Sequence, residues 1–98
     1  KVAEKTAFLR MATADAEVIL ASAKSAETKA ECRKVYEALR YSDPMSSDAL
    51  SVTEAKITVK LDELKAAAAA DDAAKTKTAA EELLLLIKER NARCKALK

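Results

Sequence analysis

Apolar residues in the first 40 positions recur at alternating spacings of three and four, which is the period of an α-helix. One row contains Leu9, Ala12, Ala16, Ile19, Ala23, Ala26 and Ala30. A second row contains Ala7, Met11, Ala14, Val18 and Ala21, and it resumes at Cys32, Val35 and Leu39. No Gly or Pro interrupts this segment, so it predicts one long amphipathic helix over residues 1–41, roughly 60 Å in length at about 1.5 Å per residue.

A cluster of turn-forming residues ends this helix. Asp43-Pro44 disfavours the helical conformation at the residue before the proline, and the serines that follow are good helix N-caps. A second helix is predicted over residues 47–70, although Ser51 and Glu54 have the spacing of a capping box and give an alternative start. The residues that mark its buried side are Leu50, Ile57, Leu61, Leu64 and Ala68. Residues 57–61 also alternate as in a β-strand, but strong helix formers flank them and no partner strand is predicted.

Two adjacent aspartates mark the next boundary. Asp71-Asp72 follow a run of alanines, and the phase of the apolar positions shifts there. Aspartate is a good N-cap and favours the positive end of the helix that follows. We therefore predict a tight turn near Asp71 and a third helix over residues 72–97, with one continuous helix over residues 47–97 as the alternative. The residues on or near the inner face of the third helix are Ala73, Ala80, Leu83, Leu84, Ile87, Cys94 and Leu97.

Three helices joined by short loops favour an all-α fold, an up-down-up antiparallel three-helix bundle with coiled-coil-like packing and a long first helix. The 98 residues form a single domain, 1–98, because a second core would have too little apolar surface. The first helix is much longer than the other two. Its first dozen residues, which include Phe8, Leu9 and Met11, are therefore expected to project beyond the bundle and to need cover from a second chain, a partner or a bend.

The composition narrows the classes of function. The absence of Gly excludes Gly-rich phosphate loops, and the absence of His removes the commonest general base and metal ligand. Eighteen basic and 16 acidic residues give a net charge of +2, which is too near neutral for an electrostatic nucleic-acid binder. The longest strongly apolar run, Leu83–Ile87, is far shorter than a membrane span. We expect a protein that is not an enzyme, needs no cofactor or metal, and binds neither nucleic acid nor a membrane.

The two cysteines and the paired carboxylates have structural interpretations. In the predicted topology Cys32 and Cys94 are offset by about 9 Å along parallel helices, which favours reduced thiols used as small apolar residues over an extracellular disulfide. Two thiols without His or a CxxC motif do not make a zinc site. Adjacent carboxylates, such as Glu81-Glu82, point about 100° apart on a helix and do not form a catalytic pair.

The run Leu83–Ile87 is the most informative candidate for a contact surface. Five consecutive apolar residues cover more than one face of a helix, and Leu85 is the one expected to be exposed. The run either lies under the long first helix or contacts another protein. Tyr36 and Tyr41 either seal the loop end of the bundle or belong to an interface. Leu85 and Tyr36 are therefore candidate partner contacts.

Three segments of the chain resemble the tubulin-binding cofactor A proteins, which are small three-helix bundles. Residues 5–11 are similar to the opening of the family's first helix, residues 42–48 to its Asp-Pro connection, and residues 72–84 to its closing helix. The resemblance implies a cytoplasmic, cytoskeleton-associated chaperone that captures β-tubulin during the assembly of the microtubule heterodimer, without nucleotide, metal or covalent chemistry. The matched positions that it implies as possible contacts are Lys5, Phe8 and Arg10.

Two other functions stay open from the sequence. The chain begins at Lys1 rather than Met, which would fit a processed, secreted or surface-anchored helical spacer or interaction module with oxidised cysteines. A fragment of a larger coiled-coil scaffold is the other alternative. A count of free thiols separates the first alternative from a cytoplasmic protein, and in either case a monomer or a weak homodimer is expected.

Overall fold

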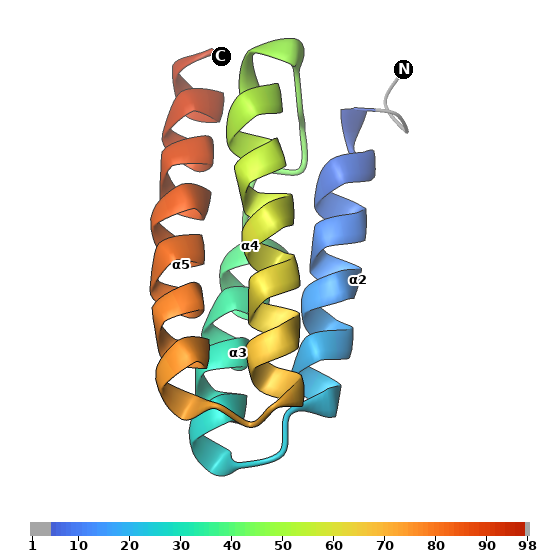
Figure 1. Cartoon of the computed structure of the whole chain (residues 1–98). Coiled ribbons are helices and arrows are strands. Elements are labelled where there is room, and N and C mark those ends of the chain that lie inside the picture. Colours follow the sequence, from blue (N-terminus) through green and yellow to red (C-terminus); the bar gives the residue numbers. More distant parts are fainter. Residues whose placement is uncertain (1–4, 98) are drawn as a thin grey trace.

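The computed structural model describes residues 5–97, which form a bundle of four α-helices (Figure 1). The helices are α2 (Ala7–Ser22), α3 (Ala26–Arg40), α4 (Ser51–Ala69) and α5 (Ala73–Ala96), and a short 3-10 helix, η1 (Asp48–Leu50), precedes α4. In the view of Figure 1 the chain runs down α2, up α3, down α4 and up α5. The bundle measures 39 × 21 × 19 Å.

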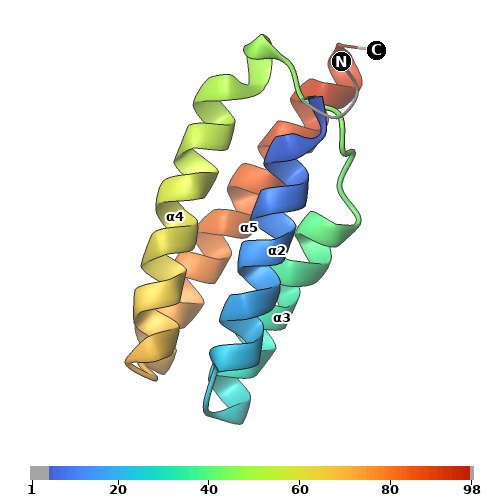
Figure 2. The ribbon, with the colours of Figure 1, turned by 90° about the vertical axis from the view of Figure 1, so that its right-hand side faces the viewer.

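The four helices pack as two antiparallel hairpins laid side by side. α2 packs against α3, and α4 packs against α5; α2 also packs against α4, and α3 against α5. α3 and α4 follow each other in sequence but lie at opposite corners of the bundle and touch only slightly. The connection over residues 41–50 therefore crosses one end of the bundle, as Figure 2 shows.

One apolar core runs along the axis between the four helices. Its large side chains include Leu9, Ile19, Val35, Leu39, Ile57, Leu64, Leu83 and Ile87, all buried. Alanines complete it where the helices approach each other, and these include Ala12, Ala16, Ala68 and Ala80. Because interhelical distance depends on the side chains at the contact, these alanines allow close packing along the core.

The predicted single helix over residues 1–41 is wrong, because the chain turns sharply between α2 and α3. Ala23 and Ser25 have extended backbone conformations, with ψ values of 141° and 161°. Ser25 is the N-cap of α3, and its side chain accepts a hydrogen bond from the Thr28 N–H at 3.2 Å. The fold is thus all-α, as predicted, but it has four helices in the described residues rather than three.

This turn also removes the predicted overhang of the first helix. The bundle is only 39 Å long, so it cannot contain a straight helix of about 60 Å. Leu9 belongs to the core, and Phe8 packs against it, so both are covered by the bundle itself. Met11 is exposed, and residues 1–4 of the expected overhang lie outside the described residues.

The other predicted boundaries agree with the structure. α4 and α5 lie within the predicted ranges 47–70 and 72–97, and residues 57–61 are helical. The turn predicted near Asp71 is confirmed: Asp71 has a positive φ of 52°. Asp72 is the N-cap of α5, and its Oδ1 accepts a hydrogen bond from the Lys75 N–H at 3.0 Å.

Candidate protein-binding surface

The end of the bundle crossed by residues 41–50 is built around Arg90, whose side chain is fully buried. Its Nε donates a hydrogen bond to Glu54 Oε2 at 3.1 Å, which completes an ion pair. Its Nη1 donates to the carbonyl of Asp43 at 2.8 Å and to Oδ1 of Asn91 at 3.2 Å. Its Nη2 donates to the carbonyl of Met45 at 3.1 Å. All three guanidinium nitrogens therefore have acceptors, two of which belong to the connection itself.

The partners of Arg90 are held in turn by the elements around them. Ser46 Oγ lies 2.7 and 2.8 Å from the two carboxylate oxygens of Glu54 and donates to them. The Ser46 N–H donates to the carbonyl of Lys5 at 2.7 Å. The ring of Phe8 lies against the guanidinium, 5.7 Å from centroid to Cζ, in a cation–π contact. Arg90 thus joins the start of α2, the connection, α4 and α5.

This centre is structural rather than a binding site for a ligand. Every buried side-chain nitrogen and oxygen in residues 5–97 has a hydrogen-bond partner. The donors of Arg90 point to acceptors within the chain, and its positive charge is balanced by Glu54. A buried ion pair is stable only when such hydrogen bonds are complete.

The opposite end of the bundle is closed by Asp71. Its Oδ1 accepts a hydrogen bond from Thr28 Oγ1 at 2.9 Å and another from the Ser25 N–H at 3.3 Å. Hydrogen bonding by the side chain of Thr28, and then by the side chain and backbone N–H of Ser25, lowers the pKa of the Asp71 carboxyl. Lys24 Nζ donates to the carbonyl of Ala69 at 3.3 Å. Asp71 therefore ties the α2–α3 turn to the α4–α5 turn.

The five residues predicted as partner contacts do not form one surface. Lys5 and Arg10 are exposed near the start of α2, whereas Phe8 packs against the core and Arg90. Tyr36, on α3, is partly buried against the core. Leu85 lies on the outer side of α5 with 69% of its surface exposed, so its predicted exposure is confirmed. Leu85 and the α2 residues lie on different helices that occupy opposite corners of the bundle.

An exposed apolar surface that the sequence interpretation missed follows the outer side of α4. We call it the α4 stripe, and it consists of Val52, Ala55, Val59, Ala66 and Ala70, all exposed. Val52 and Val59 have 67% and 57% of their surface exposed. These positions recur at helical spacing on the side opposite the buried Ile57, Leu61 and Leu64. α4 is therefore apolar on two sides, and the second one is covered by no other part of the described chain.

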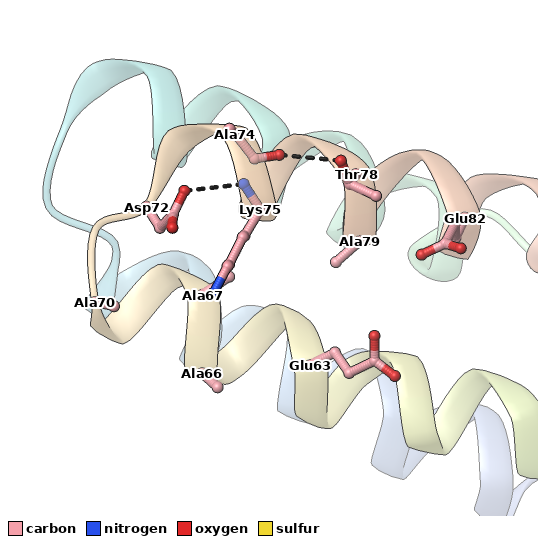
Figure 3. A pocket seen from close by; sticks show the side chains of 10 residues that line it. All are labelled: Glu63, Ala66, Ala67, Ala70, Asp72, Ala74, Lys75, Thr78, Ala79 and Glu82. Carbon is pink, nitrogen blue, oxygen red and sulfur yellow. Dashed lines mark hydrogen bonds between the residues drawn. The ribbon is translucent and has the colours of Figure 1, made fainter.

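A groove between α4 and α5 borders the lower half of the α4 stripe (Figure 3). It has a volume of about 510 Å³. Alanines form half of its lining: Ala66, Ala67, Ala70, Ala74 and Ala79. Glu63 and Glu82 lie toward one end and Lys75 extends across the other, toward Ala67 (Figure 3). The groove is thus apolar along its floor and charged at its ends.

Lys60 forms ion pairs with both glutamates of this groove. Its Nζ lies 3.0 Å from Glu82 Oε1 and 3.1 Å from Glu63 Oε1. The hydrogen bonds to Glu82 and Glu63 raise the pKa of Lys60. Lys60 therefore stays positively charged and links α4 to α5 beside the α4 stripe.

Cys32 and Cys94 are both buried free thiols. Burial, reinforced by the charge of Glu31, raises the pKa of the Cys32 thiol. The Sγ of Cys94 lies 3.5 Å from the carbonyl of Met45, at the end of the bundle that contains Arg90. Neither cysteine reaches the α4 stripe.

No helix in residues 5–97 is long and apolar enough to cross a membrane. In the same residues, the structure groups no three His, Cys, Asp or Glu side chains that could hold a metal ion. The chain matches no protein-family model, no curated protein and no solved structure. Its function is therefore inferred from the α4 stripe and from the sequence resemblance.

Proposed function

We propose that this chain is a non-enzymatic protein-binding module whose contact surface is the α4 stripe with the adjoining groove, and that β-tubulin is the protein it holds. The observation that carries the proposal is the exposed apolar side of α4. Contiguous apolar surface on a small helical protein is typical of a site that another protein covers. An apolar groove beside such a helix also suits an amphipathic helix of the partner.

β-Tubulin is the proposed partner because of the resemblance in residues 5–11, 42–48 and 72–84. The contact surface differs from the one that the resemblance implies. Phe8 faces Arg90 and the core, so it is less available to a partner than Val52 or Val59. A chaperone that holds β-tubulin during heterodimer assembly acts in the cytoplasm, so the proposal includes that location.

Retention of purified tubulin by the immobilised chain tests both parts of the proposal. At micromolar concentrations we expect β-tubulin to be retained by the wild type, and the Val59→Lys variant to retain at least tenfold less. Val18→Lys is the matched control, because Val18 is equally exposed, at 63%, but lies on α2 outside the α4 stripe. If the wild type retains no tubulin, β-tubulin is not the partner. If Val59→Lys binds as the wild type does, the α4 stripe is not the contact surface.

A further inference from the structure

Two opposite charges flank the α4 stripe on the same side. Lys56 and Glu63 are seven residues apart, so on a helix they differ by only about 20° in direction. Both are exposed, and Val59 lies close to the midpoint between them. Lys56 forms no ion pair within the described residues 5–97, whereas Glu63 shares Lys60 with Glu82. On this side of the α4 stripe, the charge before Val59 is thus the unpaired positive charge of Lys56, and the charge after it is the partly paired negative charge of Glu63.

This pattern is complementary to itself when a second α4 lies antiparallel across the first. A two-fold axis near Val59 places Lys56 of each copy opposite Glu63 of the other, because residues whose numbers add to about 119 then face each other. The same register places Val59 near its own equivalent and Val52 opposite Ala66, so the apolar positions also meet. A parallel arrangement would instead place Lys56 against Lys56 and Glu63 against Glu63, which is unfavourable.

We infer that the α4 stripe is the interface of a homodimer, in which the α4 helices of two copies pack antiparallel about Val59. The position of α4 allows this contact, because α4 lies at a corner of the bundle and forms its outer edge in Figure 2. Two-fold symmetry forms the Lys56–Glu63 contact twice, once on each side of the axis. The occupant of the α4 stripe in the free protein is thus a second copy of this chain.

The size of α4 indicates a weak and reversible dimer. A helix of 19 residues is roughly 28 Å long, and a contact strip about 10 Å wide buries roughly 300 Å² on each copy. Stable interfaces bury about 800 Å² per partner, so this contact belongs with transient ones. We therefore expect self-association that is weak but detectable below millimolar concentration, which leaves the α4 stripe accessible to a tighter partner at lower concentration.

Sedimentation equilibrium of the full chain between about 10 µM and 1 mM tests the inference, with charge reversal as the diagnostic. Lys56→Glu and Glu63→Lys should each weaken self-association at least tenfold, because each places like charges opposite each other. The double variant should restore the wild-type constant within about threefold. An equimolar mixture of the two single variants should form a heterodimer, because the two positions are both acidic in one variant and both basic in the other. Val18→Lys should associate as the wild type does.

Three results would overturn the inference. The first is that the chain is monomeric at 1 mM. The second is that neither single charge reversal weakens the dimer. The third is that Val18→Lys weakens the dimer as much as the charge reversals do. The inference concerns the same surface as the proposed function but is tested without tubulin. A dimer that retains no tubulin would remove only the proposed function, whereas a monomer that retains tubulin through Val59 would remove only the dimer.

Discussion

The two ends of the bundle are both closed by a polar side chain that joins separate connections. At one end, the fully buried Arg90 pairs with the buried Glu54 and donates partly buried hydrogen bonds to the carbonyls of Asp43 and Met45. At the other end, Asp71 accepts hydrogen bonds from Ser25 and Thr28, and it is exposed. The first end has a ten-residue connection over residues 41–50, and the second has two tight turns.

The comparison shows how burial changes the consequence of losing a polar contact. Removing one partner of a buried pair leaves an uncompensated charge in the protein interior, which costs several kcal/mol. Removing an exposed hydrogen-bonding group costs less, because water replaces the lost contact. The connection and the tight turns both have backbone hydrogen bonds, such as those from Ser46 N–H to Lys5 and from Asp72 N–H to Ala67. The connection is held in addition by the fully buried guanidinium of Arg90, whereas the side chain that joins the two turns is exposed.

The largest expected effect is that of Arg90→Ala. It leaves Glu54 buried without its ion pair and removes the donors to two carbonyls of the connection. We expect a loss of about 3–5 kcal/mol in the free energy of unfolding, measured by urea denaturation. The double variant Arg90→Met with Glu54→Leu should recover much of this loss, because it removes both buried charges together.

Arg93→Ala is the matched control for this prediction. Arg93 lies one turn away on α5 and pairs with Glu89 at 3.3 Å, but these side chains are 61% and 43% exposed. An exposed pair of this kind contributes less than about 1 kcal/mol. A loss for Arg90→Ala no larger than that for Arg93→Ala would contradict the importance of the buried centre.

Substitutions of Asp71 should have a smaller effect, graded by two requirements of the turn. The position needs a positive φ and an acceptor for the Ser25 and Thr28 donors. Asn tolerates the left-handed conformation and keeps an acceptor, Gly keeps only the conformation, and Ala keeps neither. We expect the melting temperature to fall least for Asp71→Asn, more for Asp71→Gly and most for Asp71→Ala. If Asp71→Ala lowered the free energy of unfolding as much as Arg90→Ala does, the two ends would not differ in their contribution to stability.

The turn at Asp71 was predictable from the sequence, whereas the turn at Ser25 was missed for an identifiable reason. The prediction of one long helix takes two apolar rows as a single stripe whose direction changes slowly around one straight helix. Ile19 and Val35 are 16 residues apart, so on one straight helix they would point about 160° away from each other. Both are buried in the same core, which the turn between α2 and α3 makes possible. The signal was therefore present, together with Ser25 as an N-cap, but alanines in both rows obscured the change of phase.

The candidate surface was harder to predict, because apolar residues in a sequence do not show which side of a helix the fold covers. Leu85 was identified correctly as exposed, since it lies in a run too long for one face. Val52 and Val59 were missed, because α4 is apolar on both sides and only packing decides which side is buried. The role of Arg90 was also missed, since a lone arginine on a charged helix is usually exposed.

The contribution of Asp71 should depend on pH, and this sharpens the comparison with Asp71→Asn. The hydrogen bonds of Thr28 and Ser25 lower the pKa of Asp71 in the folded protein below its ordinary value of 3.8. The stabilisation is therefore complete above about pH 5 and is lost as the pH falls below 4 through the folded pKa. The melting temperatures of the wild type and Asp71→Asn should converge between pH 5 and pH 2.5. A constant gap over that range would show that the Asp71 charge makes no contribution.

The smallest expected differences are local openings, which the two thiols report from different parts of the bundle. Cys94 lies beside the Met45 carbonyl, near Arg90, and Cys32 lies on α3, the helix that begins at the turn held by Asp71. Both are buried, and the pKa of Cys32 is raised by that burial, so each should react slowly with a thiol reagent at pH 8 in the folded protein.

The reaction rate of each thiol can be measured separately in variants that keep one cysteine, made with Cys94→Ala or Cys32→Ala. Adding Asp71→Ala should increase the reaction rate of Cys32 by a larger factor than that of Cys94. Adding Arg90→Ala should increase the reaction rate of Cys94 by at least as large a factor as that of Cys32. If the reaction rates of both thiols increased by equal factors in both variants, the bundle would open only as a whole. The two ends would then differ in how much they stabilise the fold but not in how they open.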